Sequence, residues 1–262
     1  MKPVLALDFD GVISDSLLEA YLITWRISGR LDPALAPADS SLPACGTIHG
    51  FRSSNQAHWQ AFSALVPFGN RAEDYLVIQK AVRLGRSFAS QEEFTAFRDT
   101  FARGLLERFH ELFYIERYRL ADSEPERWLA LNDPYPGVKE ALRELAGRFE
   151  LAVATSKDRE TVLKLLADWG LSDLFGAERV LDKRAGESKR EHLSLLREHF
   201  GCAFDRIAFI DDKLTHLVNC AGLGVRPYLA GWGYNGLQER LLAARHGIPV
   251  LELENLSSLP VP

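Results

Sequence analysis

Two carboxylates stand where an apolar segment ends near the N-terminus. Asp8 and Asp10 follow the uninterrupted apolar run 4–7, which is typical of a strand buried on both faces of a parallel sheet. Alternation along such a strand carries the two side chains to the same side as the chain leaves the sheet. Neighbouring carboxylates repel unless a cation or a shared proton intervenes, and Gly11 permits a tight turn or a close approach to a ligand. The segment therefore has the features of a reaction centre.

Two further apolar runs, 151–154 and 207–210, also end in polar residues. Those residues are Thr155, Ser156, Asp211 and Asp212. If all three runs are parallel strands of one sheet, their carboxyl ends share the edge where open α/β sheets bind ligands. Hard oxygen ligands of this kind suit Mg²⁺, which proteins usually hold with few carboxylates, several waters and a phosphate. We therefore expect a magnesium site at this edge.

Elements that could position these residues follow from residue 132 onward, where apolar runs alternate with helical periodicity. We expect helices over 138–145, from Asp158 to about Trp169, from Ser188 and from Leu214, and strands at 150–155, near Val180, at 207–210, at 225–229 and at 249–251. Such alternation predicts βαβ units and an α/β fold with a doubly wound parallel sheet.

Residues 15–131 have a different sequence pattern, because apolar residues recur there with helical periodicity and no longer form strand-like runs. Apolar residues recur there at spacings of three and four, which predicts one buried helical face; they are Phe94, Phe97, Phe101, Leu105, Phe109 and Phe113. Residues 31–50, rich in Pro, Ala, Ser and Asp, predict an irregular loop. We expect 1–14 and 132–262 to form the catalytic α/β core, with 15–131 as an all-helical cap inserted after the first strand.

Composition narrows the function classes. The chain has 262 residues, a net charge of −5 and no strongly basic block, which argues against nucleic acid as a partner. No signal peptide or membrane span is visible, and Cys45, Cys202 and Cys220 lack a metal-type spacing. These features favour a cytoplasmic protein, and they leave open whether it is a monomer or a homodimer.

In its motifs the chain resembles the phosphatase branch of the haloacid dehalogenase superfamily. The motifs occur in the order of that family: residues 8–12, Thr155 at the end of a strand, a basic residue at Lys189, and the pair 211–212. Residues 13–16 are similar to those of phosphoglycolate phosphatase relatives. The resemblance implies a Rossmann-like core with a helical cap.

The resemblance also implies Mg²⁺-dependent hydrolysis of a small phosphate monoester. Asp8 would be the nucleophile that forms an aspartyl-phosphate, and Asp10 would be the general acid and base. Lys189 would balance the clustered negative charge and orient Asp8. The implied metal ligands are Asp8, Asp10 (through its backbone carbonyl), Asp211 and Asp212. The implied phosphate-binding residues are Gly11, Thr155, Ser156 and Lys189.

Some assignments have alternatives. Lys183 and Lys157 are other candidates for the basic residue, and Asp212 could instead cap the following helix. The segment 231–234 is interpreted first as loop packing and second as a wall of the substrate pocket. The scattered histidines are interpreted as surface or packing residues; they are His49, His58, His110, His192, His199, His216 and His246.

Asp10 bears on the type of reaction. In the dehalogenating and phosphonate-cleaving relatives this acid is absent, so its presence favours phosphoryl transfer from an oxygen leaving group. A sugar-phosphate mutase is the alternative enzyme, and a catalytically silent module that binds a phosphorylated ligand is the alternative of another class. Polar cap residues that could select the substrate are Arg26, His49, Arg52 and Lys80.

Overall fold

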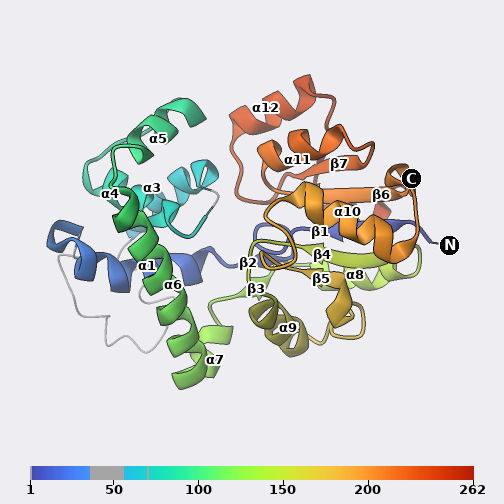
Figure 1. Ribbon diagram of the computed structural model, residues 1–262, viewed down its shortest axis with the longest axis horizontal. Helices are drawn as coiled ribbons and strands as arrows, with labels where there is room; N and C mark the ends of the chain where they lie inside the picture. Colours follow the sequence, from blue (N-terminus) through green and yellow to red (C-terminus); the bar gives the residue numbers. More distant parts are fainter. Residues whose placement is uncertain (1, 36–55, 70) are drawn as a thin grey trace. The chain divides into compact units, whose positions relative to one another are not determined.

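A computed structural model describes residues 2–35, 56–69 and 71–262, and these divide into two units (Figure 1). One unit joins Met1–Asp15 to Asp133–Pro262, and the other is Ser16–Asn132. The predicted loop at 31–50 lies outside the described residues from position 36 onward, as do Cys45, His49 and Arg52.

A parallel sheet forms the centre of the first unit. Among the described residues it has six strands in the order β5-β4-β1-β6-β7-β8. Their bounds are β1 Val4–Leu7, β4 Glu150–Ala154, β5 Val180–Leu181, β6 Ile207–Asp211, β7 Arg226–Ala230 and β8 Val250–Leu251. This order, with β1 between β4 and β6, confirms the predicted doubly wound α/β fold.

Both faces of the sheet are covered by helices, which explains the continuous apolar runs. Val4 and Ala6 of β1 pack in one cluster with Leu193 of α10 (Lys189–Phe200) and Leu217 of α11 (Leu214–Ala221). The remaining helices of the unit are α8 (Val138–Ala146), which contacts β4, α9 (Arg159–Asp168), which contacts β5, and α12 (Leu237–Arg245). All of β1 is buried.

Two helix starts confirm the predicted capping residues. The Asp158 carboxylate accepts a hydrogen bond from Thr161 N at 2.9 Å, and the Ser188 hydroxyl accepts one from Glu191 N at 3.3 Å. Helix α12 was not predicted. Its leucines at 237, 241 and 242 are exposed while Ala243 is buried, so its apolar residues do not mark one buried face.

A short antiparallel ribbon, also not predicted, lies where the chain passes between the two units. Strand β2 (Ser14–Asp15) pairs with β3 (Asp133–Pro134). Strands of two residues have no alternation that a sequence pattern could reveal. The ribbon holds together the two chain segments that flank the insertion.

Among the residues that the structure describes, the regular elements of the second unit are all helices. Its helices are α1 (Leu17–Leu31), α3 (Gln56–Leu65), α4 (Asp74–Arg83), α5 (Gln91–Arg98), α6 (Arg103–Ser123) and α7 (Pro125–Leu129). In the described part of the chain, no helix has the length and apolar character needed to cross a membrane.

The prediction of one continuous helical face from Phe94 to Phe113 was wrong. The stripe is divided between α5 and α6, because a turn intervenes in which the Thr100 hydroxyl donates to Phe97 O at 2.7 Å and Phe101 N donates to Arg98 O at 3.0 Å. The spacing of the apolar residues continues across this turn, although the helical backbone is interrupted there.

A buried ion pair lies within the helical unit. Arg117 of α6 donates two hydrogen bonds to the carboxylate of Glu19 on α1, at 3.1 and 2.9 Å, and Trp128 Nε1 donates a third at 2.7 Å. The Glu19 side chain has no exposed surface. Since the carboxylate and guanidinium are both removed from water, each depends on the other. Of the predicted polar cap residues, Arg26 pairs with Glu116 and Lys80 with Asp32.

Replacing Arg117 with Met should destabilise the protein by about 3–5 kcal/mol, because Glu19 would remain buried and charged without its partner. The matched control is Arg103→Met, which breaks an exposed pair with Glu107 and should cost less than about 1 kcal/mol. Urea unfolding followed by circular dichroism measures both. Equal losses for the two variants would contradict a special role for the buried pair.

Candidate active site

The site is built where three neighbouring strands end. Leu7 of β1 is paired with Val153 of β4 on one side and with Ile210 of β6 on the other. Asp8 N continues the ladder by donating to Ile210 O at 2.9 Å. The register therefore places Asp8, Thr155 and Asp211 at the same edge of the sheet, as parallel pairing requires.

Lys189 contacts all three strand ends. Its Nζ lies 2.8 Å from Asp8 Oδ2 and 3.2 Å from Asp211 Oδ2, and it donates to Ala154 O at 2.6 Å. The side chain is 6 % exposed. An ammonium group has three donors, so all of them are used here. The other two basic candidates are placed differently: Lys183 is exposed, and Lys157 contacts Asp10.

The electrostatics of this cluster follow from burial and mutual charge. Burial raises the pKa of Asp8, although Lys189 opposes the shift. Burial alone would raise the pKa of Asp211 and lower that of Lys189. Lys189 and His216 outweigh burial and lower the pKa of Asp211, and Asp211 and Asp8 outweigh it and raise the pKa of Lys189. The site therefore holds a charged lysine against an ionised Asp211.

Asp10 is positioned by a turn and not by strand alternation. Strand β1 ends at Leu7, and the amides of Val12, Ile13 and Ser14 all donate to Phe9 O. This tight turn directs the Asp10 carboxylate toward Lys157, whose Nζ lies 3.0 Å from Asp10 Oδ1. The alternation argument therefore stops at Asp8.

The Asp212 side chain lies in a tight cradle formed by Gly11, Gly233 and Tyr234, and the first two of these must be glycines. Gly11 has φ +82°, and a Cβ there would collide with the Asp212 carboxylate, while a Cβ on Gly233 would collide with Asp212 Cβ and the Gly11 carbonyl. Tyr234 N donates to Asp212 Oδ2 at 2.9 Å. Helix α11 has Lys213 as its N-cap, without a side-chain cap. The alternative that Asp212 caps this helix is therefore not borne out.

The segment 231–234 forms the wall of this cradle. Besides the Tyr234 amide, Trp232 Nε1 donates to Val12 O at 3.0 Å, and the Tyr234 hydroxyl donates to Asp15 Oδ1 at 3.0 Å. Its packing against the turn that carries Asp10 is thus established.

Thr155 and Ser156 follow β4. Thr155 is buried, its amide donates to Leu181 O, and its Oγ1 accepts a hydrogen bond from Lys157 N at 3.1 Å. Since that oxygen acts as an acceptor, the hydroxyl proton can be donated to a ligand. Ser156 is exposed.

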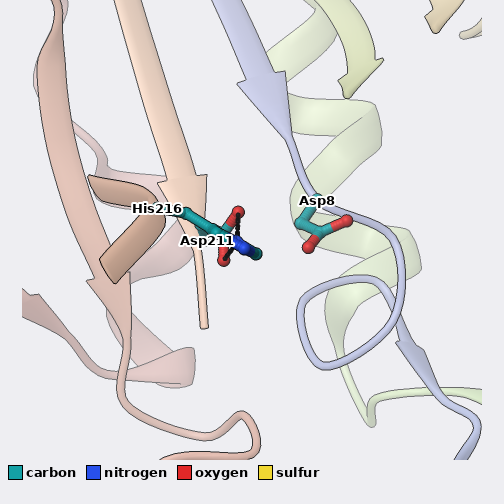
Figure 2. A group of neighbouring side chains, drawn as sticks. All are labelled: Asp8, Asp211 and His216. Atoms are coloured by element: carbon teal, nitrogen blue, oxygen red, sulfur yellow. Dashed lines mark hydrogen bonds and ion pairs between the residues drawn. The ribbon is translucent and has the colours of Figure 1, made fainter. Parts of the chain in front are cut away.

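His216 belongs to the site, although sequence reasoning interpreted it as a packing or surface residue. Its Nδ1 lies 3.1 Å from both Asp211 oxygens. Figure 2 shows these two side chains together with Asp8. Burial would lower the pKa of His216, but Asp211 outweighs burial and raises it. The signal that could have found it is its place near the start of the helix after Asp211.

The donor set fits a divalent cation. Asp8, Asp211 and His216 offer ligand atoms that lie within 4.8 Å of one another. Burial, together with the charges of Asp211 and Asp8, raises the pKa of Asp212 to about 7. Lys189 lies between Asp8 and Asp211, and the charge of the buried Lys213 opposes the rise in the pKa of Asp212 without cancelling it. A bound cation would offset the remaining negative charge, and oxygen ligands suit Mg²⁺.

Comparison with known proteins identifies the family. The model of the haloacid dehalogenase-like hydrolases matches residues 3–217. The chain therefore belongs to the haloacid dehalogenase-like hydrolase family, which confirms the predicted membership. No curated protein matches the chain significantly.

Solved structures share the fold. A haloacid dehalogenase-like family hydrolase from Streptococcus pneumoniae is 13% identical with a TM-score of 0.63, covering 98% of this chain and 96% of its own. A predicted phosphoglycolate phosphatase from Haemophilus somnus is 19% identical with a TM-score of 0.57, covering 89% and 87%. A predicted phosphatase from Clostridium acetobutylicum is 14% identical with a TM-score of 0.56, covering 98% and 97%. At these identities the similarity establishes the fold.

Because the pKa of Asp212 is raised, its place in the metal site can be tested by stability measurements without a substrate. In the folded protein without metal, the charged form of Asp212 is disfavoured, so stability should fall as pH rises from about 4 to about 7. Asp212→Asn keeps an acceptor for Tyr234 N and removes the charge. In EDTA at pH 8 we expect the variant to be more stable than the parent by roughly 1–3 kcal/mol.

Thermal unfolding with and without Mg²⁺ completes this test. Mg²⁺ should raise the Tm of the parent and leave that of Asp212→Asn nearly unchanged. A variant that is less stable in EDTA, and still stabilised by Mg²⁺ as much as the parent, would remove Asp212 from the metal site.

Proposed function

We propose that this chain is a Mg²⁺-dependent phosphatase that hydrolyses a small phosphate monoester through an aspartyl-phosphate on Asp8. The observation that carries the proposal is the separate placement of two carboxylates at one strand end. Asp8 is held by the buried Lys189, and Asp10, whose side chain is 33% exposed, is held by Lys157. One carboxylate is suited to attack phosphorus, and the other can exchange a proton with a ligand.

In the first step, a carboxylate oxygen of Asp8 forms a bond to phosphorus, and the bond from phosphorus to the ester oxygen breaks. The Asp10 carboxyl group gives its proton to the departing oxygen, so the alcohol leaves neutral. Lys189 keeps Asp8 oriented and compensates its charge as the anionic phosphate approaches. The Thr155 hydroxyl and the Ser156 amide donate to the phosphoryl oxygens.

In the second step, water attacks the phosphorus of the aspartyl-phosphate. Asp10, now ionised, takes a proton from the water, the bond between phosphorus and the Asp8 oxygen breaks, and inorganic phosphate leaves. Mg²⁺ held by the carboxylates of Asp8, Asp211 and Asp212 and by the Asp10 carbonyl would offset the negative charge of the phosphoryl group.

The helical unit, Ser16–Asn132, is proposed to be a cap that selects the leaving group and excludes water. The support is its connectivity. It is inserted directly after the turn that carries Asp10, between the two strands of the β2–β3 ribbon. A substrate class of small phosphorylated metabolites agrees with the phosphatase names of the structural relatives.

Asp8→Asn should lower the rate of p-nitrophenyl phosphate hydrolysis by at least about 10³-fold, because an amide cannot form the phospho-intermediate. EDTA should abolish activity in the parent, and Mg²⁺ should restore it. Rapid acid quench with ³²P-labelled substrate should trap a label in the parent and none in Asp8→Asn. Phosphate release that survives both the substitution and the chelator would overturn the proposal.

Lys189→Met should reduce activity by about 10²-fold or more, since Asp8 and Asp211 would then repel each other without compensation. Lys183→Met is the matched control and should retain the parent rate, because Lys183 is exposed. Steady-state kinetics on the same substrate compares them. A loss confined to the Lys183 variant would transfer the role of the basic residue to that position.

Incubation with a hexose 1-phosphate distinguishes hydrolysis from the mutase alternative. The phosphatase releases free phosphate in step with the loss of substrate. An isomeric hexose phosphate formed without free phosphate would favour the mutase.

A further inference from the structure

A second buried lysine contacts the turn at the active site. The Lys157 side chain has no exposed surface, and its Nζ lies 3.0 Å from Asp10 Oδ1. A buried ammonium group is costly unless it is paired, so this contact constrains both residues. The Asp10 carboxylate is only partly buried. The lysine is therefore the fixed partner, and the carboxylate is the one that can reach a ligand.

The backbone around Lys157 is fixed on both sides. Its own amide donates to Thr155 Oγ1 at 3.1 Å, and the next residue, Asp158, accepts a hydrogen bond from Thr161 N as the cap of α9. Its Nζ also lies 5.9 Å from the centroid of the Phe9 ring. Lys157 thus extends from a rigid strand-to-helix junction, whereas Asp10 belongs to a turn beyond the end of β1.

We propose that Lys157 is a positioning residue for Asp10, and that it orients this carboxylate toward the leaving-group oxygen. The proposal rests on the proposed phosphatase function. Lys189 bonds Asp8 and Asp211 while Lys157 bonds Asp10, so each lysine serves a different step of the chemistry. Through Lys157, the acid/base group is kept apart from the nucleophile although only one residue separates them in the chain.

If Lys157 positions Asp10, the reaction rate should depend on the leaving group in a specific way. When the ester bond breaks, a proton passes from the Asp10 carboxyl group to the departing oxygen, forming an alcohol and leaving a carboxylate. A nitrophenolate departs readily without that proton, whereas a more basic phenolate requires it. A misplaced Asp10 therefore slows poor leaving groups more than good ones. A lysine that merely bound phosphate, or stabilised the fold, would affect all leaving groups equally.

The test compares p-nitrophenyl, phenyl and p-methoxyphenyl phosphate as substrates, which differ little in size. Its readout is kcat/KM, because this parameter covers the steps up to formation of the aspartyl-phosphate. In the parent, kcat/KM should vary little across the series. In Lys157→Met it should fall at least tenfold more for p-methoxyphenyl than for p-nitrophenyl phosphate, and Asp10→Asn should show the same asymmetry.

Further variants separate positioning from folding. The double variant Asp10→Asn/Lys157→Met should be no slower than Asp10→Asn on p-methoxyphenyl phosphate, because Lys157 acts through Asp10. Lys157→Gln keeps a hydrogen-bond donor and should be intermediate, and it replaces the Met variant if that variant fails to fold. Lys164→Met on α9, an exposed lysine, is the control and should retain the parent profile.

The outcomes are distinct. An equal loss across the three substrates in the Lys157 variants would overturn the positioning role while leaving the phosphatase intact. Additive losses in the double variant would do the same. A folded parent protein that hydrolyses none of the three substrates would overturn the proposed function, and this inference with it.

Discussion

The structure of the site depends on one buried ammonium group. Lys189 Nζ is bonded to Asp8, Asp211 and the carbonyl of Ala154, which are the ends of three adjacent strands. Carboxylates buried at this edge would otherwise repel each other in a medium of low dielectric constant. The lysine is the first residue of α10, and the Ser188 hydroxyl caps that helix. The Ser188 cap therefore fixes the position of Lys189 at the start of α10, and the register of the sheet fixes which carboxylates the ammonium group contacts.

The two other acidic residues of the site, Asp10 and Asp212, are held by separate segments of the chain. The turn after β1 turns Asp10 toward Lys157, and the loop after β7 holds Asp212 against Gly11. The same loop is bonded to Asp15 of the ribbon through the Tyr234 hydroxyl. The nucleophile, the acid/base group and the metal ligand proposed here thus have different partners. Each side chain is therefore held in its own orientation.

The helical insertion brings its own source of stability. Glu19, Arg117 and Trp128 join α1, α6 and α7 in a buried group linked by three hydrogen bonds. A unit with its own core can be inserted into a loop without disturbing the sheet, because only the β2–β3 ribbon must close.

The sequence by itself determined the buried strands, their polar ends and the family, since continuous apolar runs and capping residues such as Asp158 and Ser188 are local signals. It could not decide which lysine contacts which carboxylate, because Lys157 and Lys189 are the same residue type and only the tertiary structure distinguishes their positions. It also missed His216, whose partner is fixed by the turn between β6 and α11. The break at Thr100 and the cradle of Asp212 were likewise decided by tertiary structure, because backbone turns and contacts between distant loops leave no periodicity in the chain.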